Sequence, residues 1–170
     1  HVFTLNKRCI MKIAIIDYGA GNVKSVQYAL QRNQVESVLT NNPNELKASQ
    51  GVILPGVGHA NFAMNNLKAT GLIDCIKSLN QPVLGICLGM QLMCNSTTEG
   101  DISGLGIFNT KVVRFESSQK VPQMGWNSVK NEGCELLEGI DDEAYFYFVH
   151  SYFAELSNHS SGTTNYGQNF

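Results

Sequence analysis

Short apolar runs alternate with amphipathic segments through the first half of the chain. The apolar runs that we predict as strands are residues 12–17, 37–40, 51–54 and 82–86. The segments between them carry apolar residues at helical spacing and predict helices at residues 23–30, 44–49 and 59–67, with a further helical pattern at 72–79. Strands that alternate with helices in this way are typical of a mostly parallel open sheet with helices on both faces. We therefore expect an α/β fold whose ligands lie beyond the carboxyl ends of the strands.

The pattern changes after Glu99. Three stretches rich in β-branched and aromatic residues, separated by polar turns, predict added antiparallel strands at residues 106–115, 121–129 and 145–155. Residues 158–162 are expected to form a loop, and residues 163–170 the start of one more strand. The sequence has no internal repeat, low-complexity tract or linker, so residues 11–170 are expected to form one domain.

Length and charge narrow the possible functions. The 170 residues, of which 43% are hydrophobic, are enough for one domain with a core and too few for two ordinary domains. A net charge of -2, with 15% charged residues, offers no basic face for a nucleic acid. No apolar run approaches the roughly 20 residues of a membrane span, so we expect neither a nucleic acid nor a membrane as partner. A small molecule is the expected substrate.

The cysteines and the first ten residues set two further expectations. The five cysteines are an odd number and include no C-x-x-C pair, which argues against a disulfide framework and against a structural zinc site. We therefore expect a reducing, cytoplasmic location and neither a metal nor a cofactor. Residues 1–10 begin without methionine, have no long apolar stretch and precede Met11, so we expect them to be an extension outside the domain.

Cys87 is the first candidate functional residue. It lies between Gly85 and Gly89, where the fourth predicted strand gives way to a helix. Glycines lack a Cβ and permit a sharp turn, which would push the thiol out above the strand ends as in a nucleophile elbow. Free N–H groups and the dipole at the start of the helix favour the thiolate, which is the attacking form. The alternative is a tight turn in which Cys87 is a small buried hydrophobic residue.

A second glycine-rich turn supports the catalytic interpretation. The apolar strand 51–54 runs into Pro55-Gly56-Val57-Gly58, and two such turns can share one edge of a sheet. An elbow nucleophile needs N–H donors for the oxyanion of a tetrahedral intermediate, commonly one from the next residue and one from a neighbouring loop. The candidates are Leu88 and the Val57–Gly58 peptide. The alternative for residues 55–58 is a loop without a catalytic role.

Five segments together resemble one enzyme family. They are residues 17–22 (Asp-Tyr-Gly-Ala-Gly-Asn), 55–58, 85–91, 122–127 (Pro-Gln-Met-Gly-Trp-Asn) and 147–152 (Tyr-Phe-Val-His-Ser-Tyr). The Gly-x-Cys-x-Gly elbow in this context is similar to that of the class I, triad-type glutamine amidotransferases, and the likeness covers nearly everything from Met11 on. More narrowly, the segments resemble the glutaminase subunits of imidazole glycerol phosphate synthases, which act in histidine biosynthesis. The resemblance implies a flavodoxin-like, three-layer sandwich with added antiparallel strands.

The resemblance also implies roles for individual residues. Cys87 would attack the carboxamide of glutamine and hold a glutamyl thioester, releasing ammonia. Positions similar to those that bind glutamine in the family are Gly56, Gln91, Glu99, His150, Ser151 and Tyr152. Glu99 would pair with the substrate ammonium, and Gln91, one helical turn beyond Cys87, would bond its polar atoms. The alternatives are solvated residues at positions 91 and 99 and a core histidine at position 150.

A protein partner is implied as well. In the family, ammonia passes to a synthase (cyclase) subunit that is a (β/α)₈ barrel, and the two subunits form a heterodimer. Asn22, Trp126 and Tyr147 match positions that face or lie near that partner. Large aromatic residues with a polar atom suit an interface, and ordinary core positions are the alternative for Trp126 and Tyr147.

One part of the family's catalytic machinery is absent from these 170 residues. The resemblance requires a His-Pro-Glu motif, whose histidine carries the proton and whose glutamate orients the histidine. None of the four histidines is followed by proline, and His159 lies in a predicted loop without an acidic partner. We therefore expect the domain to be C-terminally incomplete and impaired in catalysis.

Two other functions remain open. A non-catalytic binding or regulatory module could keep the elbow and the partner surface without hydrolysing glutamine. A cysteine hydrolase or redox protein of the same fold class could use Cys87 on another substrate, but that hypothesis does not account for Gln91, Glu99 or residues 124–127. We adopt the glutaminase hypothesis and keep the binding module as its alternative.

Overall fold

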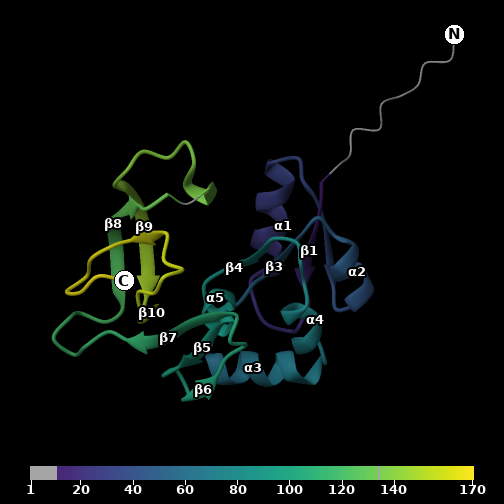
Figure 1. Cartoon of the computed structure of the whole chain (residues 1–170), viewed down its shortest axis with the longest axis horizontal. Coiled ribbons are helices and arrows are strands. Elements are labelled where there is room, and N and C mark those ends of the chain that lie inside the picture. Colours follow the sequence, from purple (N-terminus) through teal and green to yellow (C-terminus); the bar gives the residue numbers. More distant parts are fainter. Residues whose placement is uncertain (1–10, 134) are drawn as a thin grey trace, which may run out of the picture. The chain divides into compact units, whose positions relative to one another are not determined.

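The computed structural model describes residues 11–133 and 135–170, which divide into two compact units. The first unit ends at Met90 and the second begins at Gln91. Figure 1 labels the elements of both units along the chain. The extension expected at residues 1–10 lies outside the described residues, and the expectation of one domain over residues 11–170 stays a prediction.

The first unit contains a four-stranded parallel sheet. Its elements are β1 (Lys12–Ile16), α1 (Val23–Arg32), β2 (Glu36–Thr40), α2 (Pro43–Ala48), β3 (Gly51–Leu54), α3 (Ala60–Ala69), α4 (Ile73–Lys77) and β4 (Val83–Gly85). The strand order is β2-β1-β3-β4, and every neighbouring pair is parallel. The strands and helices predicted for this half of the sequence are confirmed, with ends that differ by at most two residues.

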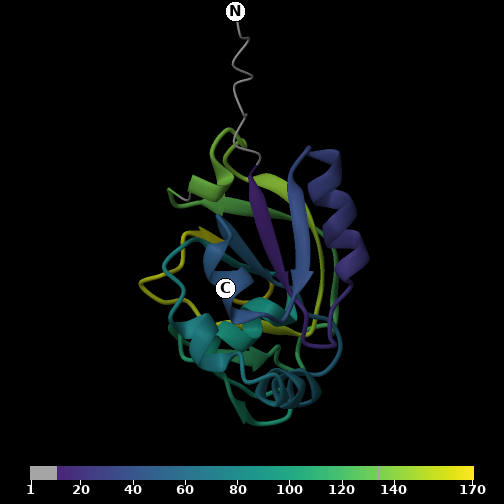
Figure 2. The same cartoon turned by 90° about the vertical axis from the view of Figure 1, so that its right-hand side faces the viewer.

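Helices cover both faces of this sheet. The chain steps from β1 to β2 in one direction and then crosses back over β1 to reach β3. Because crossovers between parallel strands are right-handed, this reversal places α1 and α2 on opposite faces. Figure 1 shows them on opposite sides of β1, and Figure 2 shows α1 running along β2. Strands covered on both faces are apolar throughout, as β3 is, and all four of its residues are buried.

Side-chain caps define where the helices of the first unit begin. The side chains of Asn22, Asn42 and His59 each accept a hydrogen bond from a backbone N–H in the first turn of α1, α2 and α3. Pro43 opens α2, at a position where its missing N–H costs nothing.

Among the described residues, no helix has the length and apolar character needed to cross a membrane.

The second unit is built mainly from strands. The helix α5 (Leu88–Met93) leads into it across the boundary, and its own elements are β5 (Cys94–Thr97), β6 (Ile102–Ser103), β7 (Phe108–Arg114), β8 (Gln123–Asn131), η1 (Glu135–Leu137), β9 (Ala144–His150), β10 (Tyr152–Ala154) and β11 (Gly162–Thr163). These strands form two sheets, in the orders β10-β7-β5-β6 and β11-β8-β9. All pairs are antiparallel except β5 with β7, so the added antiparallel strands are confirmed.

Three features of the second unit differ from the sequence-based expectation. The strands β5 and β6 were not predicted, because Asn95, Ser96 and Thr97 give β5 no apolar pattern. The predicted strand 145–155 is interrupted at Ser151, between β9 and β10. A further strand is present at Thr163, as expected, but it is only β11 (Gly162–Thr163); Gly167 takes a φ of +74° and reverses the chain, so that Asn165 bridges to Asn169.

An aromatic cluster forms part of the core of the second unit. The ring of Phe115, which follows β7, lies 4.7 to 5.3 Å from the rings of His150, Phe153, Tyr166 and Phe170. These four rings come from β9, β10 and the C-terminal turn. The cluster therefore joins the two sheets of this unit.

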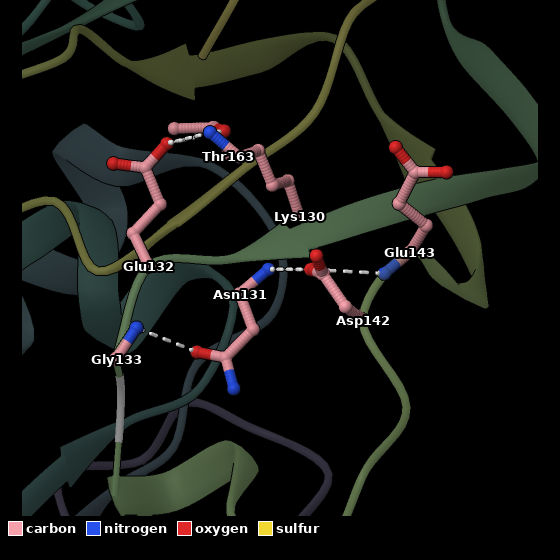
Figure 3. Close-up of polar contacts among 7 residues, drawn as sticks. All are labelled: Lys130, Asn131, Glu132, Gly133, Asp142, Glu143 and Thr163. Atoms are coloured by element: carbon pink, nitrogen blue, oxygen red, sulfur yellow. Dashed lines mark hydrogen bonds and ion pairs between the residues drawn. The ribbon is translucent and has the colours of Figure 1, made fainter.

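Polar contacts close the loop between β8 and β9. Oδ1 of Asp142 accepts hydrogen bonds from the N–H groups of Asn131 (3.0 Å) and Glu143 (3.1 Å), and Oδ1 of Asn131 accepts from the N–H of Gly133 (3.0 Å) (Figure 3). Side-chain oxygens thus bond backbone N–H groups at both ends of the loop. They fix where the hairpin begins and ends.

Candidate active site

Cys87 lies at a sharp turn between β4 and α5. It is exposed, and its φ is +52°, in the left-handed region that non-glycine residues rarely adopt. Hydrogen bonds on either side hold the turn: the N–H of Ile86 donates to the carbonyl of Leu54 (3.0 Å), and the N–H of Gly89 donates to the carbonyl of Ile86 (2.9 Å). Backbone strain at an exposed nucleophile is typical of an elbow. The alternative of a buried, structural Cys87 is wrong, because the residue is exposed.

Two glycines bring the elbow against the neighbouring loop. A Cβ on Gly89 would collide with the carbonyl oxygen of Leu54. A Cβ on Gly56 would lie 2.6 Å from the nitrogen of Gly89 and 2.8 Å from Cβ of Leu88. Both distances are shorter than real Cβ atoms allow, so only glycine fits at either position. The expectation that the two glycine-rich turns meet at one edge of the sheet is confirmed.

The loop after β3 presents the second set of candidate backbone donors. Val57 is 52% exposed and Gly58 has a φ of +96°, so the chain turns away from the sheet directly after Gly56. Leu88, by contrast, is buried at the start of α5. The three residues predicted to form an oxyanion hole therefore all belong to the two turns that flank Cys87. An exposed nucleophile at the meeting of two such turns suits acyl transfer.

The sequence of the chain matches a known family of acyl-transfer enzymes. Residues 14–169 match the family model described as glutamine amidotransferase class-I. The chain belongs to the class-I glutamine amidotransferase family. Two relatives carry the name imidazole glycerol phosphate synthase subunit HisH. The relative from Bacteroides thetaiotaomicron is 47% identical over 159 residues, which cover 92% of this chain and 81% of the relative. The relative from Haemophilus influenzae is 44% identical over 163 residues, which cover 95% of this chain and 82% of the relative.

Solved structures support the fold of this amidotransferase. A crystal structure of a glutamine amidotransferase superimposes with a TM-score of 0.69 at 15% identity, covering 92% of this chain and 85% of that one. PurLQS from Thermotoga maritima gives a TM-score of 0.66 at 16% identity, covering 93% of this chain and 76% of that one. At these identities the similarity concerns the fold, and it confirms the predicted α/β architecture.

Gln91 and Glu99 of the amidotransferase lie together in the second unit. Nε2 of Gln91 donates to Oγ1 of Thr97 (2.7 Å) and to Oε2 of Glu99 (2.9 Å), and the N–H of Glu99 donates to the same Thr97 oxygen (3.1 Å). Gln91 is only 8% exposed, so the alternative of a solvated residue is wrong for it. The helical spacing used to relate Gln91 to Cys87 does not hold, because Cys87 precedes α5 in a left-handed conformation.

His150 is held by hydrogen bonds on both ring nitrogens. Its Nδ1 lies 2.8 Å from the carbonyl oxygen of Tyr152, and its Nε2 lies 2.8 Å from the side-chain oxygen Oε1 of Gln123. Burial lowers the pKa of His150 and outweighs the bond to Tyr152, which raises it. Because a carbonyl oxygen only accepts, the neutral ring donates from Nδ1 to Tyr152. This is the arrangement of a core histidine, and it fixes the backbone on either side of Ser151.

The lowered pKa of His150 predicts that acid destabilises the chain. An unfolded histidine has a pKa of about 6.5, above that of His150 in the folded chain, so the unfolded state binds more protons between the two values. The stabilisation is fully present above the unfolded pKa and is lost as the pH falls from there through the folded pKa. Thermal melts between about pH 5 and 8 should show this fall for the wild type and a weaker one for His150→Gln. The exposed His159, changed to Gln, is the control, and equal pH dependence in all three proteins would contradict the prediction.

The residues predicted to face a partner occupy two different settings. The side chain of Asn22 caps α1 by accepting from the N–H of Ser25 (3.3 Å). Trp126 and Tyr147 are paired across β8 and β9, and they are 69% and 55% exposed, with ring centroids 5.6 Å apart. The core alternative for these two residues is wrong. The large side chains of Met124, Tyr145 and Val149, at alternate positions of the same strands, are exposed too.

The structure adds residues that the sequence analysis did not single out. Thr97 is the shared acceptor for Gln91 and Glu99, and Gln123 holds His150. Tyr18 bonds to the loop at Pro55. Gln123 and Tyr18 lie within segments that carry the family resemblance, which was the available indication for both. No feature of the sequence pointed to Thr97, because it lies in β5, a strand that was not predicted.

Proposed function

We propose that the chain is the glutaminase subunit of an imidazole glycerol phosphate synthase. It hydrolyses glutamine to glutamate and ammonia and passes the ammonia to a synthase subunit in histidine biosynthesis. The observation that carries this proposal is the strained, exposed Cys87 where two glycine-rich turns meet, in a chain 44–48% identical to relatives named HisH. A cytoplasmic location belongs to the same proposal.

The proposed reaction has two steps at Cys87. Its thiolate attacks the carboxamide carbon of glutamine, and the N–H groups of Leu88 and of the Val57–Gly58 peptide stabilise the resulting oxyanion. The C–N bond then breaks, ammonia leaves with an added proton, and a glutamyl thioester remains. Water attacks the thioester, the C–S bond breaks, and glutamate and the thiol are formed. Each step passes through an oxyanion at the same place, so one set of donors serves both.

Glutamine recognition is proposed for the residues that match glutamine-binding positions of the family. In the second unit the Glu99 carboxylate would pair with the substrate ammonium, and its bond to Gln91 orients it. The backbone of Ser151 and Tyr152, fixed by His150, would line the pocket. In the first unit Gly56, which lies against Gly89 and Leu88, would hold its loop beside the elbow where the substrate reacts.

The partner surface is proposed to include Asn22 and the exposed pair Trp126 and Tyr147. The partner is a (β/α)₈ barrel synthase subunit that consumes the ammonia, and the complex is a heterodimer. Exposed aromatic residues with polar atoms are favoured in interfaces, where their burial supplies most of the binding energy. Delivery within a complex avoids the loss of ammonia to water as ammonium.

The proposed mechanism needs a side chain that takes the proton from Cys87 and gives one to the leaving ammonia. No His-Pro-Glu is present in the 170 residues, and His150 is unsuited because both of its ring nitrogens are engaged. A positioned acid and base contribute about 10²–10⁴-fold, so we propose that these 170 residues by themselves bind glutamine and form the thioester slowly. The alternative function is a binding module without turnover.

A covalent label tests the proposed function independently of turnover. The chloromethyl ketone analogue of glutamine, in which sulfur displaces chloride, should label Cys87 and leave the buried Cys75 unlabelled, as mapped by mass spectrometry. Glutamine should protect Cys87, and glutamate release should be measured in the same samples with a barrel synthase subunit present. Labelling without protection by glutamine would overturn the proposal. Protected labelling with no glutamate release would favour the binding module.

Glu99→Gln is expected to weaken glutamine binding. The substitution keeps the shape of the side chain but removes the charge proposed to pair with the substrate ammonium. A hydrogen bond between charged groups contributes about 1.5–3 kcal/mol, so the glutamine concentration that protects Cys87 should rise about 10- to 100-fold. The exposed Glu116, changed to Gln, is the matched control and should behave as the wild type. Unchanged protection in Glu99→Gln would remove Glu99 from the site.

A further inference from the structure

Tyr18 is a buried tyrosine whose hydroxyl reaches the loop beside Cys87. It lies two residues after the end of β1 and is 3% exposed. Its Oη donates a hydrogen bond to the carbonyl oxygen of Pro55, at 2.6 Å. Burial raises the pKa of Tyr18 to about 12, so the hydroxyl keeps its proton and remains a donor at neutral pH.

Pro55 is the residue at which β3 passes into the loop. A proline has a fixed φ and no N–H, so its carbonyl is its only backbone group that a hydrogen bond can hold. The bond from Tyr18 fixes that carbonyl, and with it the plane of the peptide that leads into Gly56. Gly21 packs on the same residue, because a Cβ there would lie 3.0 Å from Cβ of Pro55. The turn after β1 thus holds Pro55 by both a polar and an apolar contact.

The fixed peptide lies next to the elbow. The following residue, Gly56, is the one whose Cα approaches Gly89 and Leu88 too closely for any side chain. Val57 and Gly58 come next, so the direction of their N–H groups depends on the plane set at Pro55. All of these contacts lie within the first unit.

We propose that Tyr18 is a positioning residue for the oxyanion hole: its hydroxyl orients the loop of residues 55–58 so that the Val57–Gly58 peptide faces the oxyanion formed at Cys87. This inference rests on the proposed function and adds a residue to its mechanism. Tyr18 does not touch the substrate and acts through the carbonyl of Pro55.

A positioning role for Tyr18 predicts that its loss slows the reaction at Cys87 and leaves substrate binding unchanged. The oxyanion exists only after the thiolate has attacked, so a misdirected donor raises the barrier without weakening the ground-state complex. Loss of an oxyanion donor costs about 10²–10³-fold in rate, and a loop that is present but less well oriented should lose about 10-fold.

The test compares Tyr18→Phe with Tyr28→Phe, which changes an exposed tyrosine of α1. The probe is the chloromethyl ketone analogue of glutamine. The thiolate of Cys87 adds to the ketone carbon to give an oxyanion; the sulfur then bonds to the neighbouring carbon as chloride leaves, and the first C–S bond breaks as the carbonyl re-forms. The maximal labelling rate and the concentration for half-maximal rate are measured separately. Iodoacetamide, whose reaction forms no tetrahedral oxyanion, reports the thiolate alone.

Tyr18→Phe should lower the maximal labelling rate about 10-fold and leave the half-maximal concentration and the iodoacetamide rate within about twofold of the wild type. An unchanged maximal rate would overturn the inference, and so would a parallel loss with iodoacetamide, which marks general damage. If Tyr18→Phe melts below the assay temperature, p-aminophenylalanine at position 18 replaces it: the amine keeps a donor and should restore the rate. A wild type that glutamine does not protect would instead refute the proposed function.

Discussion

Replacing Cys87 by glycine is expected to stabilise the chain and to abolish its reaction with glutamine. The φ of +52° costs an L-residue about 1–2 kcal/mol, and glycine adopts it freely. Glycine loses more backbone entropy on folding, about 0.5–1 kcal/mol, so the free energy of unfolding should rise by up to about 1.5 kcal/mol. Denaturant titration measures this gain. Glutamate release should fall to the level without protein, because the nucleophile is gone.

Cys87→Ala separates the two effects of the glycine variant. Alanine removes the thiol but keeps a Cβ in the left-handed conformation, so it should be as inactive as Cys87→Gly without the gain in stability. Equal stability of the two variants would mean that the strain at this residue does not exceed the backbone entropy that glycine loses. Residual glutamate release in both would mean that the activity does not come from Cys87.

Gly89→Ala is expected to disrupt the elbow altogether. Its Cβ would collide with the backbone carbonyl of Leu54, and a backbone atom cannot move aside as the end of a side chain can. The start of α5 must then separate from β3, with loss of the hydrogen bond from Ile86 to Leu54. We expect the free energy of unfolding to fall by about 3 kcal/mol or more and labelling of Cys87 by the glutamine analogue to be lost.

Gly162→Ala is the matched control for Gly89→Ala. A Cβ on Gly162, in β11, would have its nearest neighbour, Cγ1 of Val129, at 3.4 Å, which is ordinary contact. This variant should therefore keep both its stability and its labelling. If Gly89→Ala behaved in the same way, the close approach of the two glycine-rich turns would not be needed for the elbow.

The first unit was predictable because its sequence pattern and its structure express the same physical constraint. Buried parallel strands must be apolar on both faces, and helices must carry an apolar stripe, so β1, β3 and α1 are visible in the sequence. The second unit was less predictable. β5 is polar at Asn95 and Ser96, and its pairing with β7 depends on residues far along the chain.

The candidate site, too, was predictable only in part. The elbow could be predicted because glycines spaced around one cysteine have a local meaning, and the structure places Gly56 and Gly89 in contact as expected. The bonds of Tyr18 to Pro55 and of Gln91 to Thr97 could not, because each joins residues that only the folded chain brings together. The oxyanion, glutamine and partner roles stay predictions until the experiments above are done.

The exposed aromatic pair on β8 and β9 has a practical consequence. Trp126 is the single tryptophan of the chain, so all indole fluorescence arises at one place on the molecule. Its ring lies in water against the edge of Tyr147, and a protein that covered this face would transfer it to an apolar environment. The emission spectrum would then shift to shorter wavelength, which makes this side chain an intrinsic optical probe of complex formation that requires no added dye.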